Sequence, residues 1–251
     1  MLKSRIIPKL LLKDGRCVKG KRFVELRDVG HPVTNARIYE AQGADELLLL
    51  DIAASSEGRP PLLDVVTQAA REVLMPLCVG GGIRNVADIR ALLLAGADKV
   101  AINTAAVRNP AIIDDGAKLF GSQCLVVAID FRRVGDEGEV FSHGGAEPTG
   151  LDVLDQARRL ADAGAGELLL TAIDRDGTMT GYDLEITRAV ADAVSVPVIA
   201  SGGAGTLAHL AEAIQEGGAS AVAVGSLFHF TDQSPIKART YLRGAGVEVR
   251  V

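Results

Sequence analysis

The second half of this chain repeats landmarks of the first half at a constant spacing. Residues 43–50 match residues 164–171 at an offset of 121 residues. At the same offset, Pro76, Gly81 and Gly82 fall on Pro197, Gly202 and Gly203. A period of half the chain indicates two homologous halves, about 1–121 and 122–251, rather than a solenoid of short repeats.

Short apolar runs of strand length alternate with amphipathic stretches of helix length in both halves. The expected strands lie near residues 5–11, 46–51, 76–79, 99–102, 124–130, 167–171, 197–200 and 219–224. Apolar residues recur at helical spacing in 86–95, 151–163, 184–193 and 207–216. Eight strand–helix units in about 250 residues predict an α/β protein with one domain over 1–251, a (β/α)8 TIM barrel built from two duplicated half-barrels. A doubly wound open sheet is the alternative.

Composition restricts the ligands and the cellular setting. The chain has 27 Lys and Arg against 32 Asp and Glu and only 4% aromatic residues, so it lacks the charge and the stacking surfaces of a nucleic-acid-binding protein. The three cysteines contain no Cys-x-x-Cys pair, which favours a reducing compartment over a disulfide framework or a zinc site. Without a long apolar run, we expect a cytoplasmic protein that does not insert into a membrane.

Glycine-rich turns follow the third and seventh expected strands, and small polar pairs follow the fourth and eighth. In TIM barrels the site lies at these carboxyl ends, where glycine turns present bare N–H groups to an anion. The mirrored turns therefore predict an elongated ligand with a phosphate at each end. The expected contacts are Gly81, Gly82, Asn103, Thr104, Ser201, Gly202, Gly203, Gly225 and Ser226. The alternative is that these glycines only form tight turns.

Carboxylates also gather at the expected strand ends, at Asp51, Asp130 and Asp176. Asp130 closes an apolar strand, where an ionisable group needs a partner or a task; a salt bridge to Arg132 or Arg133 is the alternative. Sliding the first strand by 119 residues aligns Leu11 with Asp130. Acid–base chemistry by two carboxylates would require Asp at both positions, so the symmetry is broken at Leu11.

The four histidines are not part of any recognisable functional motif. They share no spacing and accompany no Ser or Cys motif, so we expect surface or helix-packing roles, with no catalytic triad and no metal site. They are His31, His143, His209 and His229.

Over essentially its whole length the chain resembles the cyclase subunit of imidazole glycerol phosphate synthase, a lyase of histidine biosynthesis. The segments that carry the resemblance include 13–20, 79–83, 96–104, 127–130, 173–178, 199–205 and 226–230. The resemblance implies a TIM barrel that binds a doubly phosphorylated substrate and needs no cofactor. The family's catalytic and substrate-binding positions match here at Lys13, Lys19, Asp51, Asp130, Thr171, Asp176, Gly177 and Ser201.

The resemblance also implies a partner. Family cyclases use ammonia from a glutaminase subunit that docks at the amino-terminal face of the barrel, and the ammonia passes a ring of charges inside. The matching residues are Arg5, Glu46, Lys99 and Glu167. Two acids and two bases can neutralise one another as a salt-bridged plug. The alternative is a purely structural cluster that closes the barrel.

The departure from the family lies at the catalytic end. Family cyclases carry Asp at the position of Leu11, as general acid opposite the base at Asp130, and usually Cys at the position of Lys9. Losing a general acid typically costs about 10²–10⁴ in rate. A paralogous branch has the same Leu-Leu-Leu-Lys after Ile-Ile-Pro; it occurs in O-antigen (lipopolysaccharide) clusters and is associated with ammonia supply for acetamidino sugars. Residues 75–82, 178–185 and 217–226 resemble that branch, whereas Gly20 and the tail 244–250 resemble ordinary cyclases.

Several functional hypotheses follow from this resemblance. The chain is the amidino-sugar paralogue, or a histidine-pathway cyclase in which Lys19 or Lys9 replaces the lost acid, or a non-catalytic ammonia conduit. The cyclase would make imidazole glycerol phosphate and aminoimidazole carboxamide ribotide. The related sugar isomerase fits less well, because it also relies on an Asp at the end of the first strand and has no need of the charged ring.

Lys9 has the same strand parity as Arg5 and Leu11. We therefore expect its side chain to point into the barrel. A buried lysine is costly unless it is paired, so we also expect an ion pair with Asp130 or Asp51.

Overall fold

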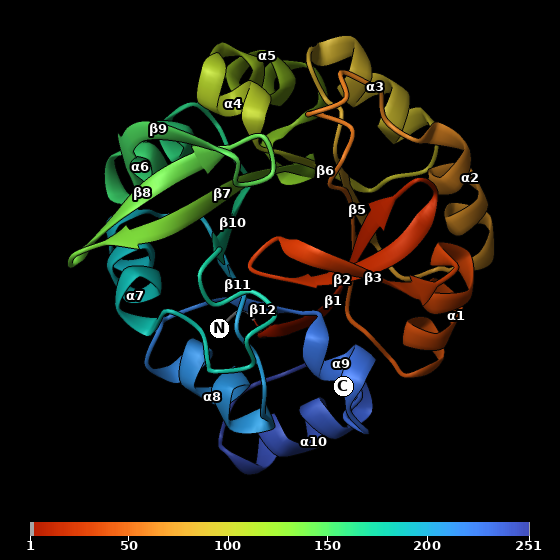
Figure 1. The fold of residues 1–251 in the computed structure, drawn as a ribbon, viewed down its shortest axis with the longest axis vertical. Coiled ribbons are helices and arrows are strands. Elements are labelled where there is room, and N and C mark those ends of the chain that lie inside the picture. The colour runs from red at the N-terminus through yellow and green to blue at the C-terminus, as the bar shows by residue number, and fades with distance from the viewer. Residues whose placement is uncertain (1–2, 251) are drawn as a thin grey trace.

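Eight parallel strands close into a barrel in the computed structural model, which describes residues 3–250 (Figure 1). Their order around the barrel is β10 (Glu167–Ala172), β11 (Val198–Ser201), β12 (Ala221–Val224), β1 (Arg5–Lys13), β4 (Leu47–Asp51), β5 (Leu77–Gly80), β6 (Lys99–Ile102) and β7 (Leu125–Val134). The pairing of β7 with β10 closes the ring, so the predicted (β/α)8 barrel is confirmed and the open sheet is wrong. Residues 1, 2 and 251 of the expected domain lie outside the described residues.

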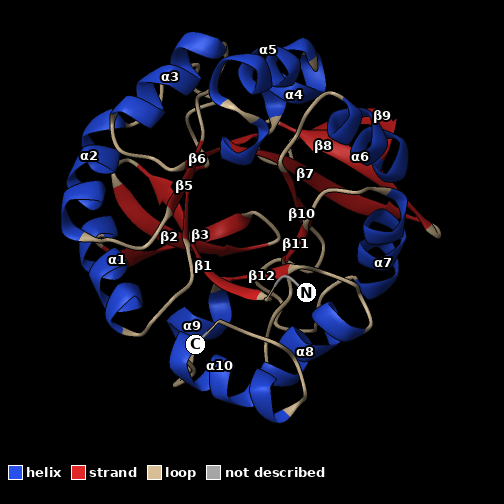
Figure 2. Ribbon diagram, turned by 180° about the vertical axis from the view of Figure 1, so that it is seen from behind, coloured by secondary structure: helices blue, strands red, loops and turns tan. Residues whose placement is uncertain are grey.

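Helices cover the outside of the barrel on all sides (Figure 2). They are α1 (Pro32–Ala41), α2 (Leu63–Glu72), α3 (Val86–Leu94), α4 (Thr104–Arg108), α5 (Ala111–Phe120), α6 (Val153–Asp162), α7 (Leu184–Ala193), α8 (Leu207–Gln215), α9 (Ser226–Phe230) and α10 (Pro235–Gly244), with a 3-10 turn at Ser122–Cys124. Side chains that accept backbone N–H bonds fix several starts, for example Asn85 at α3 and Asp152 at α6. In residues 3–250 no helix has the length and apolarity needed to cross a membrane.

Strand alternation divides the core into two layers. In β4, Leu47 and Leu49 pack outward against the helices, whereas Leu48 points into the barrel. The inner layer is formed by small and medium side chains: Ile7, Leu48, Cys78, Ala101, Val126, Ala128, Leu169, Ile199, Ala221 and Ala223. The centre of the barrel is therefore apolar.

Each half also carries an antiparallel hairpin that the sequence analysis did not predict. The first hairpin is β2 (Arg16–Lys21) with β3 (Val24–Gly30), and the second hairpin is β8 (Glu137–Ser142) with β9 (Glu147–Asp152). They extend β1 and β7 beyond the barrel. The two hairpins meet over the mouth, because a Cβ on Gly145 would lie 2.8 Å from the ring of Phe23.

The strand register supports the alignment of Leu11 with Asp130. Leu11 pairs with Leu50 of β4, and Asp130 pairs with Thr171 of β10. Leu50 and Thr171 are equivalent at the repeat offset of 121 residues. The two positions are therefore structural counterparts.

Candidate functional site

A cavity of about 360 Å³ opens at the carboxyl ends of the strands, beneath the two hairpins. The structure brings ten of the predicted site residues together around it: Lys9, Lys13, Asp51, Gly81, Gly82, Asn103, Thr104, Asp130, Thr171 and Asp176. Leu11 lines the same cavity. The position opposite Asp130 thus presents a hydrocarbon side chain to a ligand.

Asp130 lies near the end of the barrel part of β7, lines this cavity and is partly exposed to it. Burial raises its pKa to about 6, and Asp176 acts in the same direction, whereas Lys9 and Thr171 act against it. The Nδ2 group of Asn103 donates to Asp130 Oδ2 at 3.3 Å. A carboxyl group whose pKa lies this close to neutrality is suited to exchanging a proton.

The salt-bridge alternative for Asp130 is wrong. Arg132 lies over the ring of Phe141 at 4.9 Å, and Arg133 Nε lies 2.6 Å from Asp183 Oδ2. Among residues 3–250 no ion pair joins either arginine to Asp130.

Lys9 points into the barrel as predicted and is only 3% exposed, but its expected partner is wrong. Its Nζ lies 2.7 Å from Asp176 Oδ2 and donates to Ser201 Oγ at 2.9 Å. Burial alone would raise the pKa of Asp176, yet Lys9 and Lys19 hold it below its ordinary value. Lys9 is therefore joined to the second half of the barrel.

Asp51 is not free to take Lys9 because its carboxylate has other partners. Arg59 Nη1 lies 3.0 Å from Asp51 Oδ2, and the backbone N–H groups of Ala53 and Ala54 donate to Oδ1. These contacts organise the loop that follows β4.

The predicted phosphate contacts separate into two cradles, one in each half. The first cradle (Gly81, Gly82, Asn103, Thr104) opens into the large cavity. The second cradle (Gly202, Gly203, Gly225, Ser226) lines a separate space of about 10 Å³ together with Lys9, Lys19, Asp176 and Gly177. The glycine pairs have φ values of 107° and 72° in the first cradle and 89° and 114° in the second, which favour glycine.

The second cradle contains polar atoms without partners. Ser226 Oγ and Asp176 Oδ1 are buried, and neither forms a hydrogen bond in the part of the chain that the structure describes. Lys19 is buried beside Gly225, and its burial lowers its pKa to about 8 against the effect of Asp176. Unsatisfied buried groups of this kind are unusual and call for an explanation, such as a bound ion or water.

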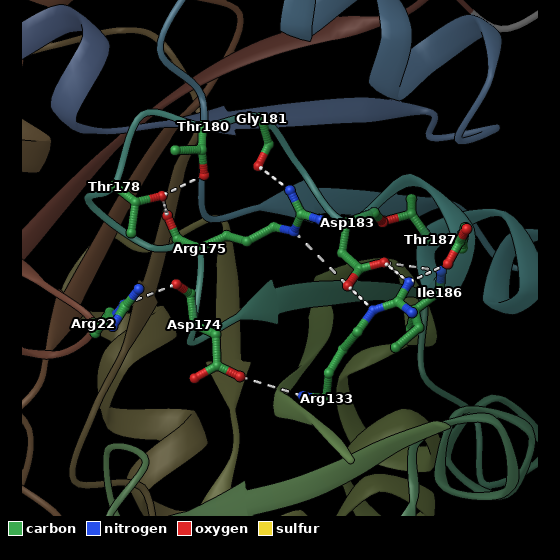
Figure 3. A network of polar contacts seen from close by, with 11 residues as sticks. Arg22, Arg133, Asp174, Arg175, Thr178, Thr180, Gly181, Asp183, Ile186 and Thr187 are labelled. Carbon is green, nitrogen blue, oxygen red and sulfur yellow. Dashed lines mark hydrogen bonds and ion pairs between the residues drawn. The ribbon is translucent and has the colours of Figure 1, made fainter. Parts of the chain in front are cut away.

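Polar contacts fix the first hairpin over the second cradle. Arg22 donates its backbone N–H to Asp176 O at 2.7 Å. Its side-chain Nε–H donates to Asp174 O at 3.2 Å (Figure 3). Asp174 Oδ2 in turn accepts from the backbone of Arg133, whose guanidinium pairs with Asp183. The hairpin of the first half thus covers the cradle of the second half.

The four predicted ring residues meet at the opposite, amino-terminal end of the barrel. Arg5 Nη1 lies 2.9 Å from Glu46 and 3.0 Å from Glu167, and Lys99 Nζ lies 2.8 Å and 3.0 Å from the same two carboxylates. Acids and bases alternate, so the four side chains form a closed ring of ion pairs below the apolar centre.

The histidines differ in their surroundings. His229 packs edge-on to Tyr39 at 6.0 Å, and burial lowers its pKa to about 4, in agreement with a packing role. His143 contradicts the expectation, because it lines the large cavity. It was missed because it lies at the turn of the unpredicted second hairpin, where its φ is 52°. Within residues 3–250, no group of three or more His, Cys, Asp or Glu side chains is placed to hold a metal ion.

A comparison with known protein families agrees with this geometry. A family model described as "Histidine biosynthesis protein" matches residues 5–234. The chain belongs to this family. Members are typically isomerases or cyclases, and the match itself does not distinguish these branches.

Proposed function

We propose that this histidine-biosynthesis-family barrel is the synthase subunit of a glutamine-dependent amidating complex. It receives ammonia at the amino-terminal face and holds a doubly phosphorylated ligand at the mouth. The observation that carries the proposal is the closed ring of Arg5, Glu46, Lys99 and Glu167 below an apolar barrel centre. The resemblance gives such a ring to cyclases and not to the sugar isomerase.

The barrel centre is suited to a small neutral molecule. Four of its ten side chains are alanines, and the others are apolar or a thiol. Moving an ion from water into this apolar centre would cost much free energy, whereas moving neutral ammonia costs much less. The mutual neutralisation of the four ring residues lets them stay at the entrance without an uncompensated charge.

Exposed leucines support a partner at the same face. Leu74 is 98% exposed, Leu94 81% and Leu119 58%, and they lie at or just after the carboxyl ends of α2, α3 and α5. These helix ends precede strand starts, so they surround the rim that carries the ring. The positions equivalent to Leu74 and Leu94 at the repeat offset are Ser195 and Gln215. We infer that the glutaminase docks off-centre, on the first half-barrel.

The two cradles are evidence for the proposal that the ligand carries two phosphates. Each presents two glycines whose conformation exposes the backbone, and Ser226 supplies an unpartnered hydroxyl in the second cradle. Such groups satisfy a phosphate by hydrogen bonding, without requiring a net positive protein.

Leu11 favours the paralogue that supplies ammonia for acetamidino-sugar synthesis over a histidine-pathway cyclase. Asp130 retains the properties of a base, but its structural counterpart has no proton to give, and Lys9 is held by Asp176 and Ser201. One observation favours the alternative: Lys19, with its pKa lowered to about 8, is a chemically reasonable substitute acid. A non-catalytic ammonia conduit would be a paralogue that has lost cyclase activity completely.

The test is turnover of the histidine-pathway ribulosyl formimino ribotide with an ammonium salt, without glutaminase. We expect the natural chain to be slower than its Leu11→Asp variant by about 10²–10⁴, because the variant regains a carboxyl opposite Asp130. A Leu10→Ala variant, changed at an outward-facing position of the same strand, is the control and should gain nothing. Equal turnover by the natural chain and Leu11→Asp would contradict the paralogue and identify an ordinary cyclase.

A further inference from the structure

The two hairpins reach across the mouth toward the opposite halves. The first hairpin brings Lys19 to Gly225 of the second cradle. The second hairpin brings His143 to the first cradle, where its backbone N–H donates to Thr104 Oγ1 at 3.1 Å. Strand register pairs Leu11 with Val18 and Asp130 with Phe141, which puts His143 one position beyond the counterpart of Lys19. Each half therefore sends one basic residue to the other half's cradle.

We propose that His143 is a phosphate ligand of the first cradle. This inference rests on the proposed function, since it names a further contact for one end of the same ligand. His143 lines the large cavity together with Gly81 and Gly82, and its side chain is 12% exposed. Its backbone is in the left-handed region, with φ of 52°.

A carboxylate contacts one of the two ring nitrogens of His143. Glu147 Oε2 lies 2.8 Å from His143 Nδ1, and Ser142 Oγ lies 3.0 Å from the same nitrogen. Nε2 forms no hydrogen bond in the described part of the chain, so it is the nitrogen available to a ligand. A protonated ring can then donate Nδ1–H to Glu147 and Nε2–H to a phosphate oxygen.

Several charged side chains around the cavity already have ion-pair partners. Lys9 is paired with Asp176, and Asp51 is paired with Arg59. The ionisable side chains that line the cavity with His143 are Lys9, Lys13, Asp51, Glu57, Asp130 and Asp176. Lys9 and Asp51 therefore have partners within the chain, whereas Nε2 of His143 is available to a ligand.

Sulfate is a suitable probe because it is a tetrahedral oxyanion, as a phosphate group is. Amide resonances of Gly82 and Gly203 in the full chain report the first and second cradles separately. We expect His143→Gln to weaken sulfate binding at Gly82 by about tenfold at constant pH, as for one lost charge-assisted hydrogen bond. The Gly203 midpoint should stay unchanged.

Two further variants separate binding from orientation. Glu147→Gln should weaken sulfate binding at Gly82 less than His143→Gln does, because the ring stays in the cavity but loses the carboxylate that contacts Nδ1. His31→Gln, at an exposed histidine before α1, is the matched control and should behave like the natural chain. An unchanged Gly82 midpoint in a well-dispersed His143→Gln spectrum would overturn the role of His143 alone. Failure of sulfate to shift either glycine would overturn the two-phosphate ligand of the proposed function as well.

Discussion

The two half-barrels share their backbone plan but differ in what their first strands bring to the mouth. β1 contributes Lys9 and Leu11, whereas β7 contributes Ala128 and Asp130 at the equivalent positions. β1 thus supplies a cation and no carboxylate, whereas β7 supplies a carboxylate. Lys9 is neutralised by Asp176 of the second half. Duplication preserved the fold, and single side chains at strand ends redistributed the charge between the halves.

The largest effect on stability should come from removing the charge of Lys9 on β1. Lys9→Met leaves Asp176 buried without its ion pair, which typically costs about 3–5 kcal/mol near neutral pH. Because the lowered pKa of Asp176 depends on Lys9, the loss should diminish as the pH falls and the carboxylate is protonated. Urea unfolding at several pH values measures this effect.

Two variants control the Lys9 experiment. Lys13→Met changes an exposed lysine of the same strand and should stay within about 0.5 kcal/mol of the natural chain. Lys9→Met combined with Asp176→Asn should recover part of the lost stability, because neither charge then remains. A single Lys9→Met variant as stable as the natural chain at neutral pH would show that the ion pair contributes nothing.

The contrast between the halves also shows where sequence reasoning reached its limit. The repeat and the apolar runs predicted all eight barrel strands, because a buried parallel strand is apolar over its whole length. The hairpins were not predicted because β3 is exposed along most of its length and its burial does not alternate. The turn at Asp14 and Gly15 was the available signal.

The site residues divide in the same way. Residues at strand ends, such as Asp130 and Thr171, could be predicted because strand ends share one face of the barrel. Contacts made by loops could not, since their positions depend on tertiary packing: Asp176 as the partner of Lys9, and His143 beside Thr104.

A smaller effect is expected from the carboxylate of the second half. Burial gives Asp130 a pKa of about 6 in the folded chain, above the ordinary value of 3.8. A raised pKa stabilises the folded state only at low pH, and this contribution is lost as the pH rises through about 6. Asp130→Asn should therefore gain stability relative to the natural chain between about pH 4 and pH 6, by at most about 3 kcal/mol.

Unfolding free energies of the Asp130→Asn variant across that pH range check the prediction. Asp115→Asn, at an exposed aspartate on α5, is the control and should give a nearly constant difference. A difference between Asp130→Asn and the natural chain that is flat with pH would mean that Asp130 ionises normally in the folded barrel.

The smallest effect concerns the amino-terminal rim, where the halves differ in apolar exposure. Replacing Leu74 by Ser or Leu94 by Gln gives the first half the residues found at the equivalent positions of the second, Ser195 and Gln215. Each change should weaken association with the proposed glutaminase subunit by about 1–2 kcal/mol, because each removes apolar area from the proposed interface. Calorimetric titration measures the loss, and folding should be unaffected since both side chains are exposed.

The reciprocal change decides whether the docking is off-centre. Ser195→Leu adds apolar surface to the second half of the same rim and should leave the affinity unchanged if the partner contacts only the first half. A partner centred on the barrel axis would instead respond to substitutions in both halves. Equal sensitivity of both halves would therefore be compatible with a docked glutaminase but would contradict off-centre docking. The four-residue ring would then lie at the centre of the proposed interface, as the proposed entrance for ammonia.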